Sequence, residues 1–410
     1  MKTTYYQLIT FCMLIFAGPV YPCTTFLIAG KYTSDGKPIL FKNRDTETMQ
    51  NSLVIFSDGK FKYLGLVDGN DEWDKMVWGG FNETGFAIIN SAAYNNNIGD
   101  TSEYMDQEGV VMKLALQTCK TLADFESLLN SLPRPMGLDA NFGVIDAFGG
   151  AAFYETGNYD FSKYDANDPD IAPAGMLIRT NHSLRSDPEE GFGYCRYNTA
   201  TAALEDLLIA KSLKPADLFG ATSRNLFHSL TKTDLRDNVP LKRDLPEFRF
   251  FIDYIPREST SSAILIIGAK DQSNAKDIMA YTILGFPLTS VAIPAWITES
   301  LYLPKAVAMR SDLTSPICTA ALALKDKCFP VKHDRGWNYI NLSVVINKEN
   351  NGYLQLLAPV ETQILNETAD LITQLELGNK NERDILLLYN RIDNLLEKKY
   401  KELFDITLFD

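Results

Sequence analysis

Histidine is scarce in this sequence, and several familiar active-site motifs are missing. The 410 residues include three histidines, and no HExxH, CxxC or GxSxG pattern occurs. The usual zinc sites and the serine hydrolases with a nucleophile elbow depend on such patterns, so these classes are excluded. We expect no metal ion and no other cofactor.

Basic runs and long apolar runs are also missing. Lys and Arg number 39 against 52 Asp and Glu, the formal net charge is −13, and no stretch is rich in Lys or Arg. This acidic balance argues against nucleic acid or anionic lipid as a partner. Beyond the N-terminal segment, no run reaches the roughly 18 apolar residues of a membrane span. We therefore expect no membrane span, and the sequence leaves the oligomeric state open.

The N-terminus has the pattern of an export signal. Lys2 is the only charged residue before Cys23, and an apolar segment over residues 8–16 ends in the small residues Ala17 and Gly18. Such a segment is typical of a secretory signal and too short for a bilayer span. We predict that residues 1–22 are a signal peptide or propeptide and that the mature protein is secreted or periplasmic. A buried first helix is the alternative.

The cysteine count indicates a free thiol. Six cysteines are present, and Cys12 would leave with the signal. Five remain, and an odd number in an exported protein leaves at least one thiol unpaired. Cys318 and Cys328 could form a disulfide, whereas Cys119 and Cys195 lie in apolar helical surroundings typical of inert core thiols. Cys23 is then the candidate reactive thiol.

The pattern of hairpins and helices predicts an α+β protein. Strands are expected over residues 24–30, 37–43, 52–56, 61–66, 84–90, 141–156 (as a hairpin), 175–180 and 261–297 (as several strands). Helical periodicity covers 108–132, with a break near Thr121 that fits an N-cap, and 195–211. From about residue 355 the chain is helical and charged, which favours helices packed on the body over a dimerising coiled coil. Two mainly antiparallel sheets with helices outside account for this order.

Cys23 has its own base if it becomes the first residue of the chain. The thiolate is the attacking form of a thiol, and the α-amino group of an N-terminal cysteine could take the thiol proton without a histidine. Three further parts are then needed. A carboxylate must hold the amine, a cation must balance charge, and amide donors must receive the oxyanion of the tetrahedral intermediate.

Candidates for all three parts occur in order along the chain. FKNRD ends the strand expected beside Cys23, so Asp45 could face Cys23 with Lys42 or Arg44 nearby. GGFNETGFAIINSAAY (79–94) adds a Gly-rich turn into a strand. Asn181 follows a strand end, and Arg196 starts a helix. Taken singly, these could be a polar strand end, a turn cap and a surface ion pair, and their order and spacing favour a site.

This ordered set resembles the N-terminal-nucleophile (Ntn) amide hydrolases. It is most similar to the penicillin acyltransferase-like peptidases (acyl-CoA:6-aminopenicillanic acid acyltransferase) and the related choloylglycine hydrolase/penicillin V acylase group. The motifs that carry the likeness are Cys23-Thr24, residues 42–45, Gly80 to Gly85, Thr180-Asn181 and residues 195–197. The resemblance covers about residues 23–300, and it implies an αββα four-layer sandwich.

The resemblance also implies roles for individual residues. Cys23 would be the nucleophile and, through its amine, the base, and Asp45 would hold that amine. Asn181 would donate to the oxyanion, and Arg196 would sit in the polar network around Asp45. A second oxyanion donor, a backbone N–H, is expected near Asn90 to Ala92.

Two departures from the family pattern stand out. Lys42 replaces the usual arginine, so bidentate carboxylate pairing is lost there, and Arg44 is the residue that could compensate. Pro22 is also a poor residue for signal peptidase to cut after. Cleavage near Gly18 followed by self-removal of PVYP would expose Cys23.

The predicted function is a secreted cysteine amidohydrolase that cleaves a linear amide of a small molecule through a Cys23 acyl-enzyme, with acyl transfer also open. Bile-acid conjugates, N-acyl amino acids and β-lactam side chains all remain candidate substrates. CTTFLIAGKYTSDGKPILFKNRD also resembles the N-terminal-cysteine dipeptidases, which is the alternative within this class. An exported lipoprotein anchored through Cys23 is the alternative from another class. We expect a catalytic domain over 23–355 and a helical extension over 356–410.

Overall fold

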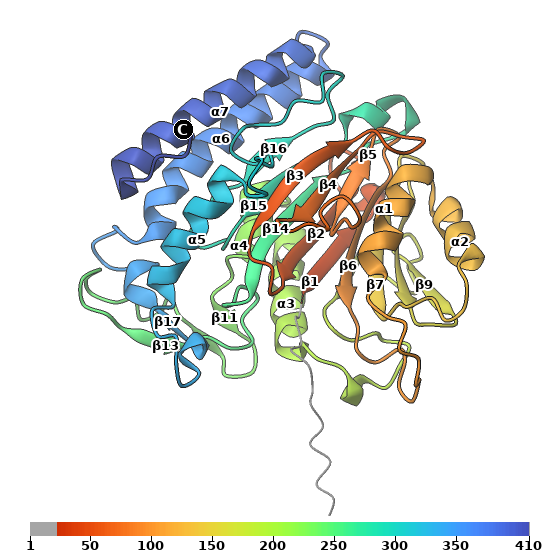
Figure 1. Ribbon diagram of the computed structural model, residues 1–410, viewed down its shortest axis with the longest axis horizontal. Helices are drawn as coiled ribbons and strands as arrows, with labels where there is room; N and C mark the ends of the chain where they lie inside the picture. Colours follow the sequence, from red (N-terminus) through yellow and green to blue (C-terminus); the bar gives the residue numbers. More distant parts are fainter. Residues whose placement is uncertain (1–22, 410) are drawn as a thin grey trace, which may run out of the picture.

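The computed structural model describes residues 23–409, and two antiparallel sheets stacked face to face form its centre (Figure 1). The predicted signal peptide or propeptide, residues 1–22, lies outside the described residues, and so does Cys12. The first sheet has the strand order β10 (Met176–Arg179), β1 (Thr24–Ile28), β2 (Ile39–Asp45), β14 (Thr260–Ile267), β15 (Met279–Leu284) and β16 (Ile293–Ala295). The second has the order β3 (Asn51–Phe56), β4 (Tyr63–Asp68), β5 (Gly80–Asn82), β6 (Ala87–Ala92), β7 (Ala140–Ile145), β8 (Ala151–Thr156) and β9 (Phe161–Asp165).

Helices cover both outer faces of this pair of sheets. The helices are α1 (Glu108–Thr118), α2 (Leu122–Ser131), α3 (Tyr194–Ala210), α4 (Pro215–Ala221), α5 (Pro316–Cys328), α6 (Tyr353–Glu376) and α7 (Glu382–Phe404). Helix α1 packs on β4, β5 and β6 of the seven-stranded sheet. On the six-stranded sheet, α3 packs on β10, α5 on β15 and α6 on β16. Between them, β1 and β2 lie against β6 and β7. The predicted αββα sandwich of the α+β class is therefore confirmed. Two small two-stranded sheets lie outside the sandwich. One pairs β11 (Phe227–His228) with β12 (Thr233–Asp234), and the other pairs β13 (Phe248–Phe250) with β17 (Tyr339–Asn341).

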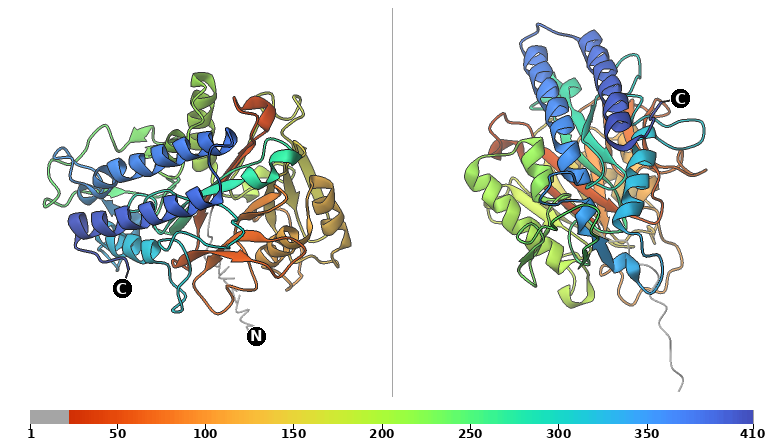
Figure 2. Two further views of the ribbon diagram at one scale, coloured as in Figure 1. Left: turned by 90° about the horizontal axis from the view of Figure 1, so that it is seen from above. Right: turned by 90° about the vertical axis from the view of Figure 1, so that its left-hand side faces the viewer.

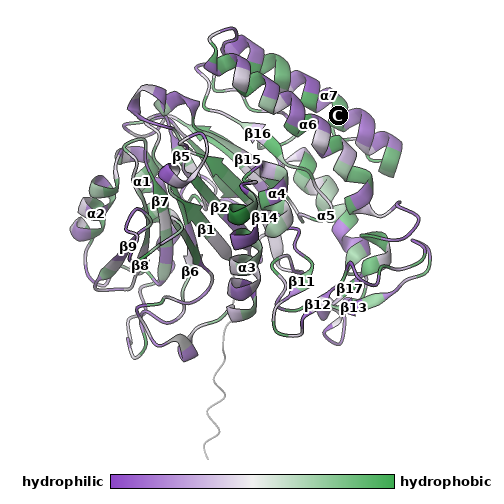
Figure 3. Cartoon of the chain, turned by 180° about the vertical axis from the view of Figure 1, so that it is seen from behind, coloured by the Kyte–Doolittle hydropathy of each residue, from purple (hydrophilic) through white to green (hydrophobic). Residues whose placement is uncertain are grey.

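Burial explains the composition of the central strands. Figure 3 shows hydrophobic residues concentrated in the sheets, with hydrophilic residues on the outer sides of the helices. All seven residues of β2 are buried, although its last four are Lys42, Asn43, Arg44 and Asp45. Burying charged groups is costly unless they are paired or hydrogen-bonded. The polar end of β2 must therefore find partners inside the protein.

The break near Thr121 separates α1 from α2, as predicted. The Thr121 side chain accepts a hydrogen bond from Asp124 N at 3.1 Å, and the Asp124 carboxylate accepts one from Thr121 N at 3.0 Å. This reciprocal pair is a capping box, which satisfies backbone N–H groups that the helix leaves without partners.

Thr121→Ala is expected to lower the free energy of unfolding by about 1 kcal/mol, because it removes this cap. Urea denaturation followed by circular dichroism measures the change. Ser127→Ala in the same exposed helix is the control, since its hydroxyl donates only to the Ala123 carbonyl one turn back. Equal effects of the two substitutions would contradict the assignment of the cap.

The structure corrects two predictions about cysteines. Cys318 and Cys328 lie ten residues apart on one helix, α5, which separates them by about 15 Å and rules out a disulfide. Both thiols are free and buried. Cys119 is buried as predicted, but Cys195 is partly exposed and is not a core residue.

Helices α6 and α7 run side by side along the outer side of the six-stranded sheet (Figures 1 and 2). They are joined to the body by buried polar contacts as well as by apolar packing. Asp393 on α7 accepts hydrogen bonds from the backbone N–H groups of Lys305 and Ala306 at 2.9 and 3.1 Å. The chain then passes the edge strand β3, where Leu53 N donates to Val307 O at 2.9 Å. Over residues 23–409, no helix is long and apolar enough to cross a membrane.

Candidate active site

Cys23 is the first described residue, and it leads directly into β1. This strand lies between β2 and β10, with Thr24 opposite Asn43 and Thr25 opposite Arg179. Cys23 is 6% exposed and forms part of the wall of a cavity of about 600 Å³. Lys42, Arg44, Asp45, Asn90 and Ala92 line the same cavity. The chain thus brings all of these predicted residues to one place, while the roles assigned to them stay predictions.

Asp45 ends β2 as a buried carboxylate with one oxygen left open. Its Oδ1 accepts hydrogen bonds from Thr260 Oγ1 at 2.6 Å and from Asn43 Nδ2 at 3.1 Å. Arg257 Nε lies 3.1 Å from Oδ2, but the contact is an ion pair outside hydrogen-bond geometry, and within the described chain Oδ2 accepts no hydrogen bond. Burial raises the pKa of Asp45, and the charges of Arg257 and Arg196 oppose that shift. One buried oxygen is therefore free to accept a further donor.

Arg196 links Cys23 to Asn181. Its Nη1 donates to Cys23 O and, at 3.1 Å, to Thr24 Oγ1, and its Nη2 donates to Asn181 Oδ1 at 2.8 Å. Burial lowers the pKa of Arg196 to about 9, and neighbouring Arg257 adds to that shift. Gly193 makes room for the guanidinium, since a Cβ there would collide with Nη2 and the residue has a φ of +91°. Arg196 thus contacts the Cys23 strand directly and reaches Asp45 only through its charge.

The amide of Asn181 has a fixed orientation. Because an arginine can only donate, the atom facing Arg196 must be the oxygen, which leaves Nδ2 on the other side. Nδ2 donates to Ala92 O at 2.8 Å. Asn181 is fully buried and lies behind Ala92, so it contacts the cavity wall without being part of it.

Lys42 and Arg44 turn toward the seven-stranded sheet. Lys42 Nζ donates to Asn90 Oδ1 at 2.6 Å and to Trp78 O at 2.9 Å. Burial lowers the pKa of Lys42 to about 8, and a negative charge on Cys23 opposes this shift. Arg44 forms two hydrogen bonds with Asp68, at 2.6 and 3.1 Å. Arg44 therefore supplies a bidentate carboxylate pair, but with Asp68 and not with Asp45.

Two residues beside Asp45 escaped the sequence analysis. Arg257 supplies the cation in contact with Asp45, and Thr260 supplies a hydroxyl donor. Both come from the turn before β14 and its start, which pairs with β2 across more than 200 residues of chain. No local motif marks these positions. His182, next to Asn181, stacks on Tyr194 at 4.4 Å, and burial lowers its pKa.

Acidic side chains are the charged groups on the rest of the cavity wall. They are Glu47, Asp68, Asp100, Asp106, Glu108 and Asp139. The cations that line the described cavity are Lys42 and Arg44, and Arg44 is paired with Asp68. Burial raises the pKa of Glu108 to about 7. Away from Cys23, this wall favours a positively charged ligand group.

One cluster outside the cavity contains side chains of the kinds that bind metals. Ligand atoms of Cys195, His228 and Asp253 lie within 4.8 Å of one another. Thr231 N donates to His228 Nδ1 at 3.2 Å, so the ring proton belongs on Nε2. A metal on Nε2 would need that proton on Nδ1, where it would face the Thr231 N–H. The hydrogen bond at Nδ1 therefore disfavours a metal ion on His228.

The chain was compared with curated proteins, solved structures and models of protein families. No curated protein matches the chain. Among solved structures, penicillin V acylase from Agrobacterium tumefaciens is 13% identical with a TM-score of 0.40, and the match covers 71% of this chain and 88% of that one. A variant of conjugated bile acid hydrolase from Clostridium perfringens is 11% identical with a TM-score of 0.41, and the match covers 67% of this chain and 92% of that one.

The family model described as acyl-coenzyme A:6-aminopenicillanic acid acyl-transferase matches residues 32–201. This segment is shorter than the resemblance predicted from the sequence, which covers about residues 23–300. It contains Asp45, Asn181 and Arg196 and begins after Cys23. The resemblance predicted from the sequence is therefore confirmed for residues 32–201, which carry the pattern of the acyl-coenzyme A:6-aminopenicillanic acid acyl-transferase family.

Proposed function

We propose that this protein is a secreted amide hydrolase whose nucleophile is the thiol of Cys23, exposed at a new N-terminus when residues 1–22 are removed. One observation carries the proposal. A single buried guanidinium, that of Arg196, bonds the carbonyl of Cys23, which lines the cavity, to the Thr24 hydroxyl and the Asn181 amide. The family match over residues 32–201 supports an enzyme that acts on amides or transfers acyl groups.

The geometry supports a sequence of proton and electron transfers. The Asp45 oxygen that accepts no hydrogen bond would hold the α-amine of Cys23, and that amine would take the thiol proton. The thiolate sulfur then attacks the substrate carbonyl carbon, and the carbonyl π electrons move to oxygen. Collapse of this intermediate breaks the C–N bond, and the leaving nitrogen receives the proton held by the Cys23 amine.

We assign the oxyanion to the amide side chains of Asn90 and Asn181, and the backbone N–H expected near Asn90 to Ala92 stays a prediction. Asn90 is on the cavity wall, and because its Oδ1 accepts from Lys42, its amide end is left for the cavity. Asn181 has a second N–H besides the one bonded to Ala92. Lys42 adds a nearby positive charge that a Cys23 thiolate would stabilise. Water would then release the acid from the thioester, or an amine would accept the acyl group.

Trapping the acyl-enzyme tests this function. The secreted protein would be mixed with N-acyl amino acids, conjugated bile acids, penicillins or dipeptides, quenched in acid, digested and weighed by mass spectrometry. We expect an N-terminal peptide that begins at free Cys23 and gains the mass of one acyl group, with release of free amine. A diacylglyceryl adduct on Cys23 would instead support the lipoprotein anchor. An uncleaved bond before Cys23 in active protein would contradict the mechanism.

The acidic wall favours a second candidate within the same class, a peptidase for substrates with a free amino group. Penicillins and bile-acid conjugates carry a carboxylate or sulfonate, which the acidic side chains would repel. The protonated N-terminus of a dipeptide would be attracted to Asp100, Asp106, Glu108 and Asp139. The cavity therefore supports a cationic substrate more directly than an anionic one.

Glu108 is expected to make this preference depend on pH. With a pKa of about 7, it is neutral in more acidic solution and gains its charge as the pH rises through that value. The kcat/KM for a substrate with a permanent trimethylammonium group, divided by that for its neutral tert-butyl isostere, should rise about 3- to 10-fold between about pH 6 and pH 8. The ratio cancels the pH dependence of the chemical step, which both substrates share.

Two variants control this measurement. Glu108→Gln should flatten the ratio, whereas Glu103→Gln should leave it unchanged, because Glu103 is exposed and outside the cavity wall. A ratio that is flat in the wild type, or that still rises in Glu108→Gln, would remove Glu108 from substrate recognition.

A further inference from the structure

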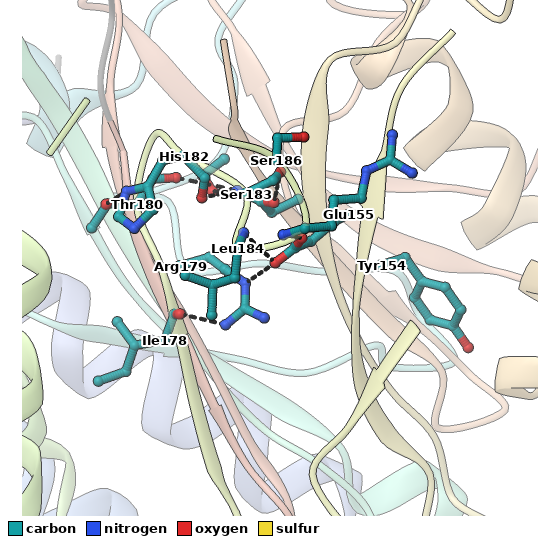
Figure 4. Close-up of polar contacts among 12 residues, drawn as sticks. Tyr154, Glu155, Ile178, Arg179, Thr180, His182, Ser183, Leu184 and Ser186 are labelled. Atoms are coloured by element: carbon teal, nitrogen blue, oxygen red, sulfur yellow. Dashed lines mark hydrogen bonds and ion pairs between the residues drawn. The ribbon is translucent and has the colours of Figure 1, made fainter. Parts of the chain in front are cut away.

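The segment that carries Asn181 is held by side chains of the opposite sheet (Figure 4). Residues 180–187 follow β10, at the edge of the six-stranded sheet. Glu155 stands on β8 in the seven-stranded sheet and is 0% exposed. A contact between Glu155 and this segment therefore crosses from one sheet to the other.

The Glu155 carboxylate binds both ends of the turn. Its Oε1 accepts hydrogen bonds from Arg179 Nε at 2.7 Å and from Leu184 N at 2.9 Å, and its Oε2 accepts one from Arg185 N at 2.8 Å. Arg179 immediately precedes Thr180, and Leu184 follows Ser183. One buried carboxylate thus fixes the two sides of the four residues that include Asn181.

Arg179 is itself fixed in place. Its Nη1 donates to Ile178 O at 2.8 Å, and its guanidinium lies over the ring of Tyr164 at 4.8 Å. The Arg179 carbonyl accepts a hydrogen bond from Thr25 Oγ1 at 2.8 Å, two residues after Cys23. The ion pair is therefore continuous with the strand that presents Cys23.

Asn141, opposite Glu155 in the β7–β8 pairing, holds the middle of the turn. Its Nδ2 donates to His182 O at 3.2 Å, and its Oδ1 accepts from Ser183 Oγ at 2.7 Å. Asn181 then projects its own amide between Arg196 and Ala92. Amide donors stabilise an oxyanion only when they are held within about 0.5 Å of the productive position.

We propose that Glu155 is a positioning residue for Asn181: it holds the turn so that the Asn181 amide can receive the oxyanion formed on attack by Cys23. This inference rests on the proposed function. Replacing one Glu155 oxygen with an amide NH₂ would set a donor against a donor, either Arg179 or a backbone N–H. The turn would then shift, and Asn181 with it.

Glu155→Gln tests the proposal, with Glu361→Gln as the matched control. Glu361 is also a buried carboxylate that pairs with an arginine, Arg224, and accepts a backbone N–H, that of Ala292, but it does not line the cavity. We expect Glu155→Gln to lower kcat by about 100-fold with a smaller change in KM. Glu361→Gln should lower the melting temperature comparably and leave kcat near that of the wild type.

Two thiol reagents separate positioning of Asn181 from damage to Cys23. With a substrate-like aldehyde, the Cys23 amine takes the thiol proton, the sulfur forms an S–C bond with the carbonyl carbon, and the carbonyl π electrons move to oxygen. That oxygen becomes the oxyanion of a hemithioacetal. Iodoacetamide forms an S–C bond with loss of iodide and develops no oxyanion. Glu155→Gln should weaken aldehyde inhibition in proportion to the loss of kcat and leave the alkylation rate of the Cys23 peptide unchanged.

The outcomes are distinct. The proposal would be overturned if Glu155→Gln lowered aldehyde affinity and kcat no more than Glu361→Gln does. It would also be overturned if Glu155→Gln lowered the alkylation rate of Cys23 as much as it lowered kcat. If Glu155→Gln does not fold, Ser183→Ala replaces it as the test, because this substitution removes only the hydroxyl bonded to Asn141. Ser183→Ala should show a smaller loss of kcat and of aldehyde affinity, with an unchanged rate of Cys23 alkylation. No loss of kcat or aldehyde affinity in Ser183→Ala would overturn the proposal. Wild-type turnover that survives complete alkylation of Cys23 would instead refute the proposed function itself.

Discussion

Replacing Cys23 with alanine is expected to lower kcat/KM for amide hydrolysis by about 10⁴-fold or more, because the proposed acyl-enzyme forms on the Cys23 thiol. The fold should survive. Cys23 is a small side chain at the start of β1, and truncating a buried thiol to a methyl group costs about 1 kcal/mol in this setting. Release of amine from the best substrate measures the activity, and thermal unfolding measures the stability.

Cys119→Ala is the control for that experiment. Cys119 is another buried free thiol, it does not line the cavity, and burial raises its pKa to about 11. The Cys119→Ala protein should therefore be less stable than the wild type but retain its rate of amide hydrolysis. Amide hydrolysis at the wild-type rate by the Cys23→Ala protein would rule out Cys23 as the nucleophile.

Asn181→Asp is expected to lower kcat by about 100- to 1,000-fold, the usual effect of removing one oxyanion donor. The aspartate keeps an oxygen for Arg196 but places its second oxygen against Ala92 O, where the wild type has an N–H donor. It also sets a negative charge beside the developing oxyanion. Steady-state kinetics should show the loss mainly in kcat, because the donor acts on the transition state.

A buried asparagine away from the cavity controls for general damage. Asn347 is 1% exposed, and its Nδ2 donates to Ser343 O at 2.9 Å. Asn347→Asp should destabilise the protein while kcat stays near the wild-type value. A loss in KM alone for Asn181→Asp would mean that Asn181 binds substrate and does not stabilise the oxyanion.

The sequence predicted the parts of the fold that local patterns determine. Turn residues mark the β1–β2 hairpin, and the capping residues at Thr121 mark the division between α1 and α2. The C-terminal helices follow from their apolar periodicity. Each of these signals lies within a few residues of the structure it predicts.

Contacts between distant segments could not be predicted in the same way. The pairing of β14 with β2 brings Arg257 and Thr260 to Asp45, and nothing near residues 257–260 indicates this. The partners of Lys42 and Arg44 lie on the opposite sheet: Lys42 bonds to Asn90, and Arg44 bonds to Asp68. Helix α5 was not predicted, which is why its two cysteines looked able to pair.

The contact between β3 and residues 307–308 bears on how the protein avoids self-association. Strand β3 is an outer strand of its sheet, and such strands offer unpaired backbone groups to any passing chain. Here Leu53 is already occupied, because its N–H donates to Val307 O and it bridges to Ala308. Asp393 on α7 holds the chain just before that bridge. Helix α7 thus protects the seven-stranded sheet, which is formed by residues 51–165, against unwanted strand addition.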